Sequence, residues 1–184
     1  MEVVIIIGSQ ASGKSTLSNK YKELSYTYLN RDSLGNNARI KHLYPLLEAA
    51  LSRNENVVID NTHPTKISRA EFINIAKKFG ASINAKVMTT SIEDCQFNAA
   101  IRMIKKYGKV IEDEDIKKCK DSNLFPTVVL FNYRNIYEQP ILSEGFDSIE
   151  YFEFKRIWND EYKKLYELLA TLSPKLSKLI TVKN

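Results

Sequence analysis

The sequence predicts an α/β fold with a mainly parallel, five-stranded sheet, helices on both faces of the sheet and a helical lid. Short apolar runs alternate along the chain with stretches of helical periodicity, which is the pattern of strand–helix–strand units. The runs at 2–7 and 56–60 contain uninterrupted stretches of valine and isoleucine, and this composition is typical of strands buried on both faces.

Five strands and five helices follow from these patterns. The strands are expected at 2–7, 26–30, 56–60, 82–89 and 149–154, and the helices at 14–23, 33–53, 65–79, 91–106 and 125–137. Pro45 predicts a kink or a restart within the second helix. Gly80 is positioned to end the third helix, and a Ser-x-x-Asp cap at Ser91 opens the fourth.

The bulk properties favour a single domain over 1–184, with a lid at about 102–122. The 184 residues are 43% hydrophobic and 27% charged, and no apolar run approaches the roughly 18 residues that cross a bilayer. The N-terminus has no signal-peptide pattern, and Cys95 and Cys119 are expected to be free thiols in a reducing compartment. A soluble, intracellular protein of the cytoplasm or nucleus is therefore expected, without a membrane partner.

The stretch "GSQASGKST" (8–16) follows the first buried strand and fits G-x-x-x-x-G-K-S/T. Its glycines let the backbone amides face a phosphate chain, and the helix that follows adds its positive end. In this pattern the lysine reaches the β- and γ-phosphates, and the hydroxyl after it ligates Mg²⁺. The sequence therefore predicts a P-loop that binds a nucleoside triphosphate through Gly8, Ser9, Gln10, Ala11, Ser12, Gly13, Lys14, Ser15 and Thr16.

The rest of the sequence narrows the class of P-loop protein. The N/T-K-x-D motif of a GTPase is missing, and a large AAA-type ATPase needs a longer chain and an acidic pair after a second core strand. That strand here ends in "VVIDNTHP" (57–64). The short chain and the basic segment at 102–120 favour a P-loop kinase with a lid.

Asp32 is the candidate general base. It follows the second strand, at the edge where ligands bind in a parallel sheet, and a carboxylate there can accept a hydroxyl proton during phosphoryl transfer. Aspartate is also among the best helix N-caps, so the local sequence supports both roles equally. Both are compatible if Ser33 caps the helix instead.

Several motifs together resemble the kinase module of polynucleotide 5′-hydroxyl kinases. They are "GSQASGKST", "NRDSLG" with Arg39, "VVIDNTHP" followed by "SRAEF", "EDCQFNAAIR" and "YRNIYEQPILSEGF". The resemblance runs from about residue 2 to residue 155. It implies that Asp32 is the base toward a 5′-hydroxyl, that Mg²⁺ and ATP or another NTP are used, and that 5′-OH ends of DNA or RNA are the partners.

Arg39 is the candidate ligand for the 3′-phosphate of the acceptor. If the helix at 33–53 is continuous, Arg39 lies two turns from Asp32 on the same face. By position alone it is equally a surface arginine. Arg31 is expected to be structural, because its side chain points away from Asp32 on an extended segment.

The remaining candidates lie after the third strand and on the fourth helix. Asp60 is expected to bind Mg²⁺ through water or to orient Ser15, and Asn61 and Thr62 to contact the substrate. The alternative is an Asx turn before Pro64. His63 is interpreted as a loop residue without a catalytic role. Arg102, four residues after Asn98 on one helical face, is expected to enter the lid and neutralise charge on the transferring phosphoryl group.

The C-terminal extension at about 156–184 lies outside the resemblance. An apolar stripe recurs there at helical spacing, formed by Trp158, Tyr162, Leu165, Leu169 and Leu172. The stripe predicts a helix packed on the sheet, with a self-association or partner surface as the alternative.

These observations together predict a monomeric, Mg²⁺-dependent polynucleotide 5′-hydroxyl kinase. Two alternatives stay open: a P-loop kinase of nucleosides or sugars, and a transfer-inactive module that binds NTP and nucleic acid. The net charge of +5 fits a polyanionic partner and equally fits a lysine-rich surface.

Overall fold

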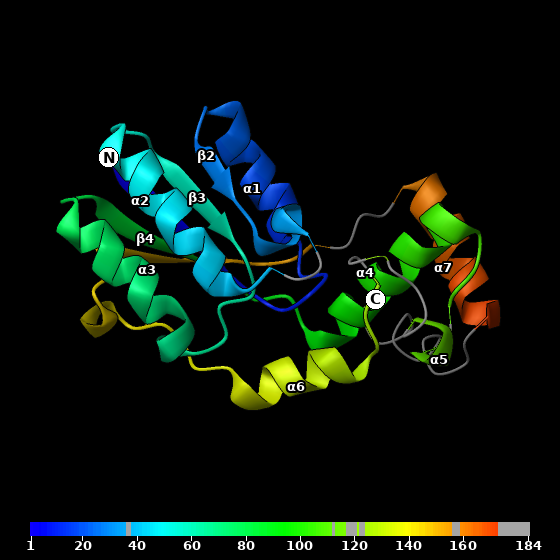
Figure 1. Ribbon diagram of the computed structural model, residues 1–184. Helices are drawn as coiled ribbons and strands as arrows, with labels where there is room; N and C mark the ends of the chain where they lie inside the picture. Colours follow the sequence, from blue (N-terminus) through cyan, green and yellow to red (C-terminus); the bar gives the residue numbers. More distant parts are fainter. Residues whose placement is uncertain (36–37, 112, 117–120, 122–123, 156–158, 173–184) are drawn as a thin grey trace.

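The computed structural model describes residues 1–35, 38–111, 113–116, 121, 124–155 and 159–172 (Figure 1). Its sheet contains β1 (Glu2–Ile7), β2 (Thr27–Leu29), β3 (Val57–Asp60), β4 (Ser82–Met88) and β5 (Ser148–Phe152). The strands are all parallel, in the order β2-β3-β1-β4-β5. The predicted five-stranded parallel sheet is confirmed, with strand ends that differ by one or two residues.

Helices cover both faces of this sheet, as predicted. On one face α1 (Lys14–Glu23) packs on the side chains of Val4, Ile6 and Val58. On the other face α2 (Tyr44–Ser52) and α3 (Lys66–Lys78) enclose the larger core around Ile5, Ile59 and Phe72. Every residue from Val3 to Ile7 is fully buried, which accounts for the apolar composition of that strand.

The predicted helix at 33–53 is wrong in its first half. Two 3₁₀ turns replace it, η1 (Arg31–Leu34) and η2 (Ile40–Leu43), and α2 begins only at Tyr44. Asn30 caps η1 by accepting a hydrogen bond from the backbone N–H of Asp32, and Gly35 ends it at a φ of 93°, which L side chains rarely adopt. The predicted restart at Pro45 is confirmed, since proline occupies the first turn of α2.

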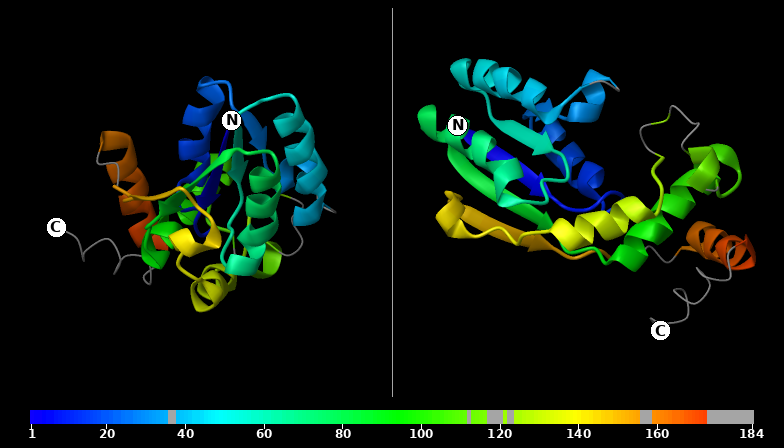
Figure 2. Two further views of the ribbon diagram at one scale, coloured as in Figure 1. Left: turned by 90° about the vertical axis from the view of Figure 1, so that its left-hand side faces the viewer. Right: turned by 60° about the horizontal axis from the view of Figure 1, so that its bottom comes forward.

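A helical layer extends beyond the carboxyl ends of the strands (Figures 1 and 2). It contains α4 (Ile92–Tyr107), the short α5 (Asp113–Ile116), α6 (Val128–Ile136) and α7 (Asp160–Leu172). A third 3₁₀ turn, η3 (Leu142–Glu144), precedes β5. The Ser91 cap of α4 and the left-handed Gly80 after α3 are confirmed.

The C-terminal helix exists, but it does not pack on the sheet as predicted. Tyr166 and Leu169 of α7 bury against Phe97 and Ile101 of α4, in a small core separate from that of the sheet. Trp158 lies outside the described residues, as does Cys119, whereas Cys95 is a buried free thiol. Among the described helices, none is long and apolar enough to cross a membrane.

Candidate active site

The P-loop turns between β1 and α1 in a form that only its glycines permit. A Cβ on Gly8 would lie 2.7 Å from the Ser12 Oγ and 2.8 Å from the Met88 Cβ, which leaves no room for a side chain. Gly13 has a φ of 95° and directly precedes α1. The loop therefore wraps the amino end of the helix, where backbone amides attract phosphate.

Lys14 is held against its own loop. Its Nζ donates a hydrogen bond of 2.6 Å to the carbonyl oxygen of Ser9. Burial lowers the pKa of Lys14 to about 8, although the nearby carboxylate of Asp60 opposes this shift. The site thus contains a desolvated ammonium group, whose charge an incoming phosphate would stabilise.

A cavity of about 420 Å³ opens above this loop and collects most of the predicted site residues. It is lined by 10–16 of the P-loop and by Asn30, Arg31, Asp32, Ile40, Asp60, Asn61, Thr62, His63, Pro64, Ser68, Arg102 and Phe125. Gly8 and Ser9 form the base of the loop behind this lining. The cavity lies where the carboxyl ends of β1, β2 and β3 meet, as the sheet topology requires.

Asp32 faces this cavity and does not cap a helix. Asn30 provides the cap instead, and its Nδ2 also donates a 2.6 Å hydrogen bond to the backbone carbonyl of Asp60. The cap comes from neither Asp32 nor Ser33, the two residues that the sequence analysis considered. Freed from capping, the exposed Asp32 carboxylate accepts hydrogen bonds of 2.6 and 3.0 Å from Arg31.

The structure places Arg31 beside Asp32, where the sequence had predicted Arg39. Arg31, expected to point away, pairs with Asp32 and lines the cavity, because a 3₁₀ turn replaces the extended segment. Arg39 is exposed, begins η2 in an extended conformation and is absent from the cavity lining. The shared helical face that placed Arg39 beside Asp32 does not form. Arg39 precedes Ile40 at the cavity rim.

Asp60 is only 2% exposed at the end of β3. Its Oδ2 accepts a 2.9 Å hydrogen bond from Ser18 and a 3.2 Å hydrogen bond from the Tyr28 hydroxyl. Burial, followed by the charge of Asp60, raises the pKa of Tyr28 to about 12, so that this phenol stays protonated and donates. The carboxylate is therefore fixed behind the P-loop, near the charge of Lys14.

The segment after Asp60 connects the P-loop to the cavity wall. The Thr62 carbonyl accepts a hydrogen bond of 3.1 Å from the Gly8 amide, and the buried Asn61 Nδ2 has no hydrogen-bond partner among the described residues. Buried amide donors are normally paired, so Asn61 is suited to a ligand. His63 is a loop residue, as predicted. It is 2% exposed, and burial lowers its pKa to about 3, so the ring is neutral.

The long helix α4 brings Arg102 to the same cavity. Asn98, one turn earlier, donates a hydrogen bond of 2.9 Å to the Ala11 carbonyl, and Thr90 donates one of 2.7 Å to the Ser12 carbonyl. These contacts fasten α4 to the P-loop. Arg102 is exposed and close enough to lower the pKa of Lys14, so its charge acts on the phosphate site.

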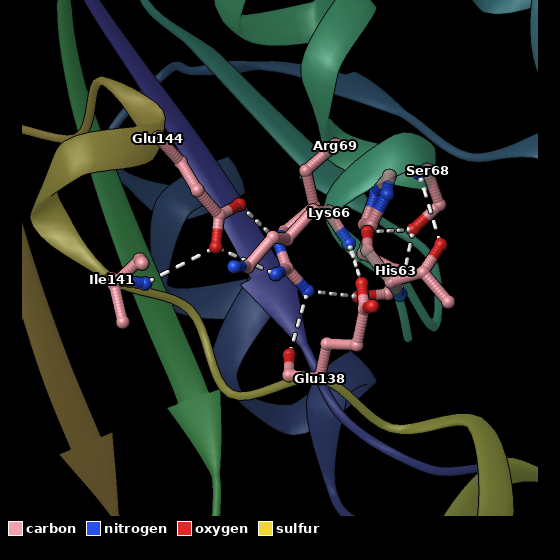
Figure 3. Close-up of polar contacts among 8 residues, drawn as sticks. His63, Lys66, Ser68, Arg69, Glu138, Ile141 and Glu144 are labelled. Atoms are coloured by element: carbon pink, nitrogen blue, oxygen red, sulfur yellow. Dashed lines mark hydrogen bonds and ion pairs between the residues drawn. The ribbon is translucent and has the colours of Figure 1, made fainter.

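A buried ion pair that the sequence did not predict supports the loop that follows β3 (Figure 3). Arg69 of α3 is fully buried and makes two 2.8 Å hydrogen bonds to Glu144 of η3. Its Nη1 also donates to the carbonyl oxygens of His63 (3.0 Å) and Glu138 (3.1 Å). Arg69 and Glu144 lie in the motifs "SRAEF" and "YRNIYEQPILSEGF". The resemblance of both motifs to one family was the available signal, but it does not say that the two segments meet.

The comparisons with known proteins agree with this arrangement. A family model described as AAA domain matches residues 3–122, more than half of the chain. The matched residues include the P-loop and α4, and β3 here ends in Asp60, followed by Asn61, without an acidic pair. The "Bifunctional polynucleotide phosphatase/kinase" of Schizosaccharomyces pombe is 29% identical over 90% of this chain and 37% of its own length.

Two further similarities cover most of the chain. The "Putative bifunctional polynucleotide phosphatase/kinase" of Acanthamoeba polyphaga mimivirus is 30% identical over 90% of this chain and 37% of its own length. The chain therefore spans little more than a third of these curated relatives. The solved structure of a fungal RNA kinase covers 100% of this chain and 99% of that one, with a TM-score of 0.55 and 15% identity, and this similarity extends to the fold.

Proposed function

This chain belongs to the AAA domain family, and from that premise we propose that it is a polynucleotide 5′-hydroxyl kinase. It transfers the γ-phosphoryl group of ATP or another NTP to the 5′-OH end of DNA or RNA. The observation that carries the proposal is a single cavity in which Asp32 faces the P-loop lysine, in a chain whose relatives are named polynucleotide phosphatase/kinases.

In the proposed reaction Asp32 is the general base. Its carboxylate takes the proton of the 5′-hydroxyl as that oxygen bonds to the γ-phosphorus and the bond to the β–γ bridging oxygen breaks. The hydrogen bond from Arg31 positions the carboxylate. Lys14 and Arg102 place positive charge where the transferring group and the leaving diphosphate gain negative charge.

Mg²⁺ fits this site as a cation that arrives with the nucleotide. The described residues contain no group of three or more His, Cys, Asp or Glu side chains that could hold a metal, and Mg²⁺ is commonly bound by one or two carboxylates plus substrate phosphates. Ser15 and Asp60 are the residues proposed to hold it. The described hydrogen bonds to the Asp60 carboxylate fall on Oδ2, so Oδ1 would be available to a metal-bound water. When bound, the cation would neutralise phosphate charge.

On the acceptor side we propose that Asn61 and Thr62 contact the terminal nucleotide inside the cavity. Arg39 at the rim binds the 3′-phosphate of that nucleotide. The buried, unpaired Nδ2 of Asn61 supports the first assignment. The exposure of Arg39 next to Ile40 supports the second, because an acceptor strand must leave the cavity across its rim.

A transfer assay with labelled ATP tests the proposal. A 5′-OH oligonucleotide, a nucleoside 3′-monophosphate and a free nucleoside should be compared as acceptors, with the Lys14→Ala protein as the control for contaminating kinases. We expect the label on the first two acceptors. Preference for the free nucleoside would favour a small-molecule kinase, and labelling of none would favour a module that binds without transfer.

A further inference from the structure

A second cavity, of about 290 Å³, lies beside the P-loop on the side of the C-terminal helix. It shares Ala11, Gly13, Thr16 and Arg102 with the larger cavity. Its remaining lining comes from Asn98, Ile101 and Lys105 of α4, from Phe154 just after β5, and from Tyr162 and Tyr166 of α7. The two cavities therefore meet at the P-loop.

The outer walls of this second cavity are apolar and aromatic. Ile101 is 5% exposed and Tyr166 is 4% exposed, whereas Tyr162 and Phe154 are only half-buried. Lys105 lies over the Tyr162 ring at 4.5 Å from its centroid and also pairs with Glu161 at 2.8 Å. A flat, partly exposed aromatic surface thus faces a phosphate-binding loop.

The direction of the triphosphate determines what this second cavity can receive. In the proposed reaction the γ-phosphate points toward Asp32, which lines the larger cavity and not the smaller one. The ribose and base leave the P-loop at the opposite end of the triphosphate chain. The four shared residues mark that junction.

We propose that the smaller cavity binds the nucleobase of the donor, against the aromatic rings of Tyr162 and Phe154. The C-terminal helix α7, which lies beyond the family match of 3–122, would then supply part of the donor site. This inference rests on the proposed function in one respect, namely that the donor is a nucleoside triphosphate bound with its γ-phosphate toward Asp32.

The packing of α7 alone does not account for this surface. Tyr166 and Leu169 make the buried contacts that attach α7 to α4, including a ring-to-ring distance of 4.5 Å between Tyr166 and Phe97. Tyr162 is one turn closer to the helix start and stays partly exposed beside Lys105. Tyr162 also packs on the edge of this core, so a variant at this position must be tested with a probe that lacks a base, which distinguishes a lost base contact from a loosened helix.

Calorimetric titration of the full chain tests the proposal with two probes, ATP and inorganic triphosphate. Tyr162→Leu keeps an apolar side chain but removes the ring, and we expect it to weaken ATP binding roughly 5- to 100-fold, the range for losing one base–aromatic stack. Binding of inorganic triphosphate should stay unchanged, because this probe has no base. Phe154→Leu should behave in the same way.

Two matched variants complete the experiment. Tyr162→Phe keeps the ring and should bind ATP like the parent protein. Leu168→Ala changes an exposed side chain of the same helix (41% exposed) and should leave both probes unaffected. Parent-like ATP binding by Tyr162→Leu, or parallel loss of ATP and triphosphate binding, would overturn the proposal.

The titration contains no acceptor, so it is independent of phosphoryl transfer. If ATP binding depends on the Tyr162 ring while no acceptor is ever labelled, the nucleobase site stands and the kinase proposal fails. If transfer proceeds normally and Tyr162→Leu binds ATP like the parent, the reverse conclusion follows.

Discussion

The donor side and the acceptor side of the cavity differ in how they are built. The P-loop is one continuous segment, and the residues that define it lie within that segment: glycine at 8 and 13, then lysine. Distant side chains only fasten it, since Thr90 and Asn98 donate hydrogen bonds to its carbonyl oxygens.

The acceptor side is assembled from distant segments. The Asn30 side chain donates a hydrogen bond to the Asp60 carbonyl oxygen. Arg69 contacts both the His63 carbonyl oxygen and Glu144, which lies 75 residues after Arg69 in the chain.

This difference explains where sequence patterns suffice to predict a site. A motif whose defining residues are contiguous can be recognised directly, so the sequence was enough to predict that a P-loop turns between β1 and α1. The orientation of Asp32 depends on which side chain caps η1, and that choice depends on a carbonyl in another strand. We therefore expect two properties of the acceptor side: Asp32 carries out the proton transfer, and residues far away in the sequence hold the loop in place.

The largest effect is expected when the general base, Asp32, is removed. Asp32→Asn keeps the shape of the side chain and removes its ability to take a proton, so transfer to a 5′-OH oligonucleotide should slow by about 10²–10⁴. ATP binding, measured by titration, should stay within a few fold of the parent, because the proposed role of Asp32 is toward the acceptor and not toward the nucleotide.

Ser33→Ala is the matched control for this loss. It alters the neighbouring residue of the same 3₁₀ turn, and its turnover should remain near that of the parent. If Asp32→Asn keeps more than about a tenth of the turnover of the parent protein, Asp32 is not the general base. The two sides of the cavity would then differ only in how they are built.

Breaking the buried ion pair should have the next largest effect. Arg69→Met leaves the Glu144 carboxylate without its partner at a side chain that is 8% exposed, and such losses cost about 3–5 kcal/mol in the free energy of unfolding. Urea denaturation followed by circular dichroism measures this cost. Arg53→Ala breaks an exposed pair with Glu55 and should leave the midpoint almost unchanged.

The same variant sharpens the comparison when it is assayed under native conditions. Because Arg69 holds the His63 carbonyl, its loss should raise the KM for the oligonucleotide more than the KM for ATP. An equal rise in both constants would show that the ion pair stabilises the whole domain without a particular role on the acceptor side.

Some of the wrong structural predictions could not have been avoided from the sequence alone. Arg39 was placed on the same helical face as Asp32, yet Gly35 adopts a φ of 93° and ends the turn. A glycine within a helical pattern is a weak signal, since an isolated glycine costs a helix only about 1 kcal/mol. The sequence does not reveal that Asn30 caps η1, because the contact that orients Asn30 comes from Asp60.

The C-terminal helix illustrates the same limit in a different way. Its apolar stripe predicted a buried face and a helical period, and both are confirmed by Tyr162, Leu165 and Leu169, which pack in the same core. The pattern does not identify the partner surface. That surface is α4 and not the sheet, because α4 itself extends past the strands and exposes the apolar face of Phe97 and Ile101.

A smaller effect is expected at Arg39, and it distinguishes a polynucleotide acceptor from a small one. A charge-assisted hydrogen bond contributes about 1.5–3 kcal/mol. Arg39→Ala should therefore lower kcat/KM for a nucleoside 3′-monophosphate or an oligonucleotide roughly ten- to a hundredfold. Slow phosphorylation of the plain nucleoside should hardly change, because it has no 3′-phosphate to lose.

Arg31→Ala is the informative partner of that variant, because Arg31 contacts Asp32 directly. It should reduce turnover on every acceptor, with or without a 3′-phosphate. If the preference for 3′-phosphorylated acceptors disappears in Arg31→Ala and persists in Arg39→Ala, the phosphate ligand is Arg31.

The smallest expected effect lies on the donor side and concerns the proton of Lys14. Burial lowers the pKa of this ammonium group to about 8 in the free protein, and bound phosphates favour its charged form, so ATP binding should raise this pKa and take up protons. Below about pH 7 the group is already protonated, and the contribution of Lys14 to affinity should be constant. As the pH rises through 8, Lys14 of the free protein loses its charge, and the affinity for ATP should fall by up to about tenfold per pH unit.

Titrations at pH 8 in two buffers of different ionisation enthalpy measure the proton uptake, and Lys14→Met should abolish it. ATP binding with no proton uptake at pH 8 and equal affinity at pH 7 and 9 would show that Lys14 is charged throughout, and that the P-loop does not desolvate its lysine before the nucleotide arrives.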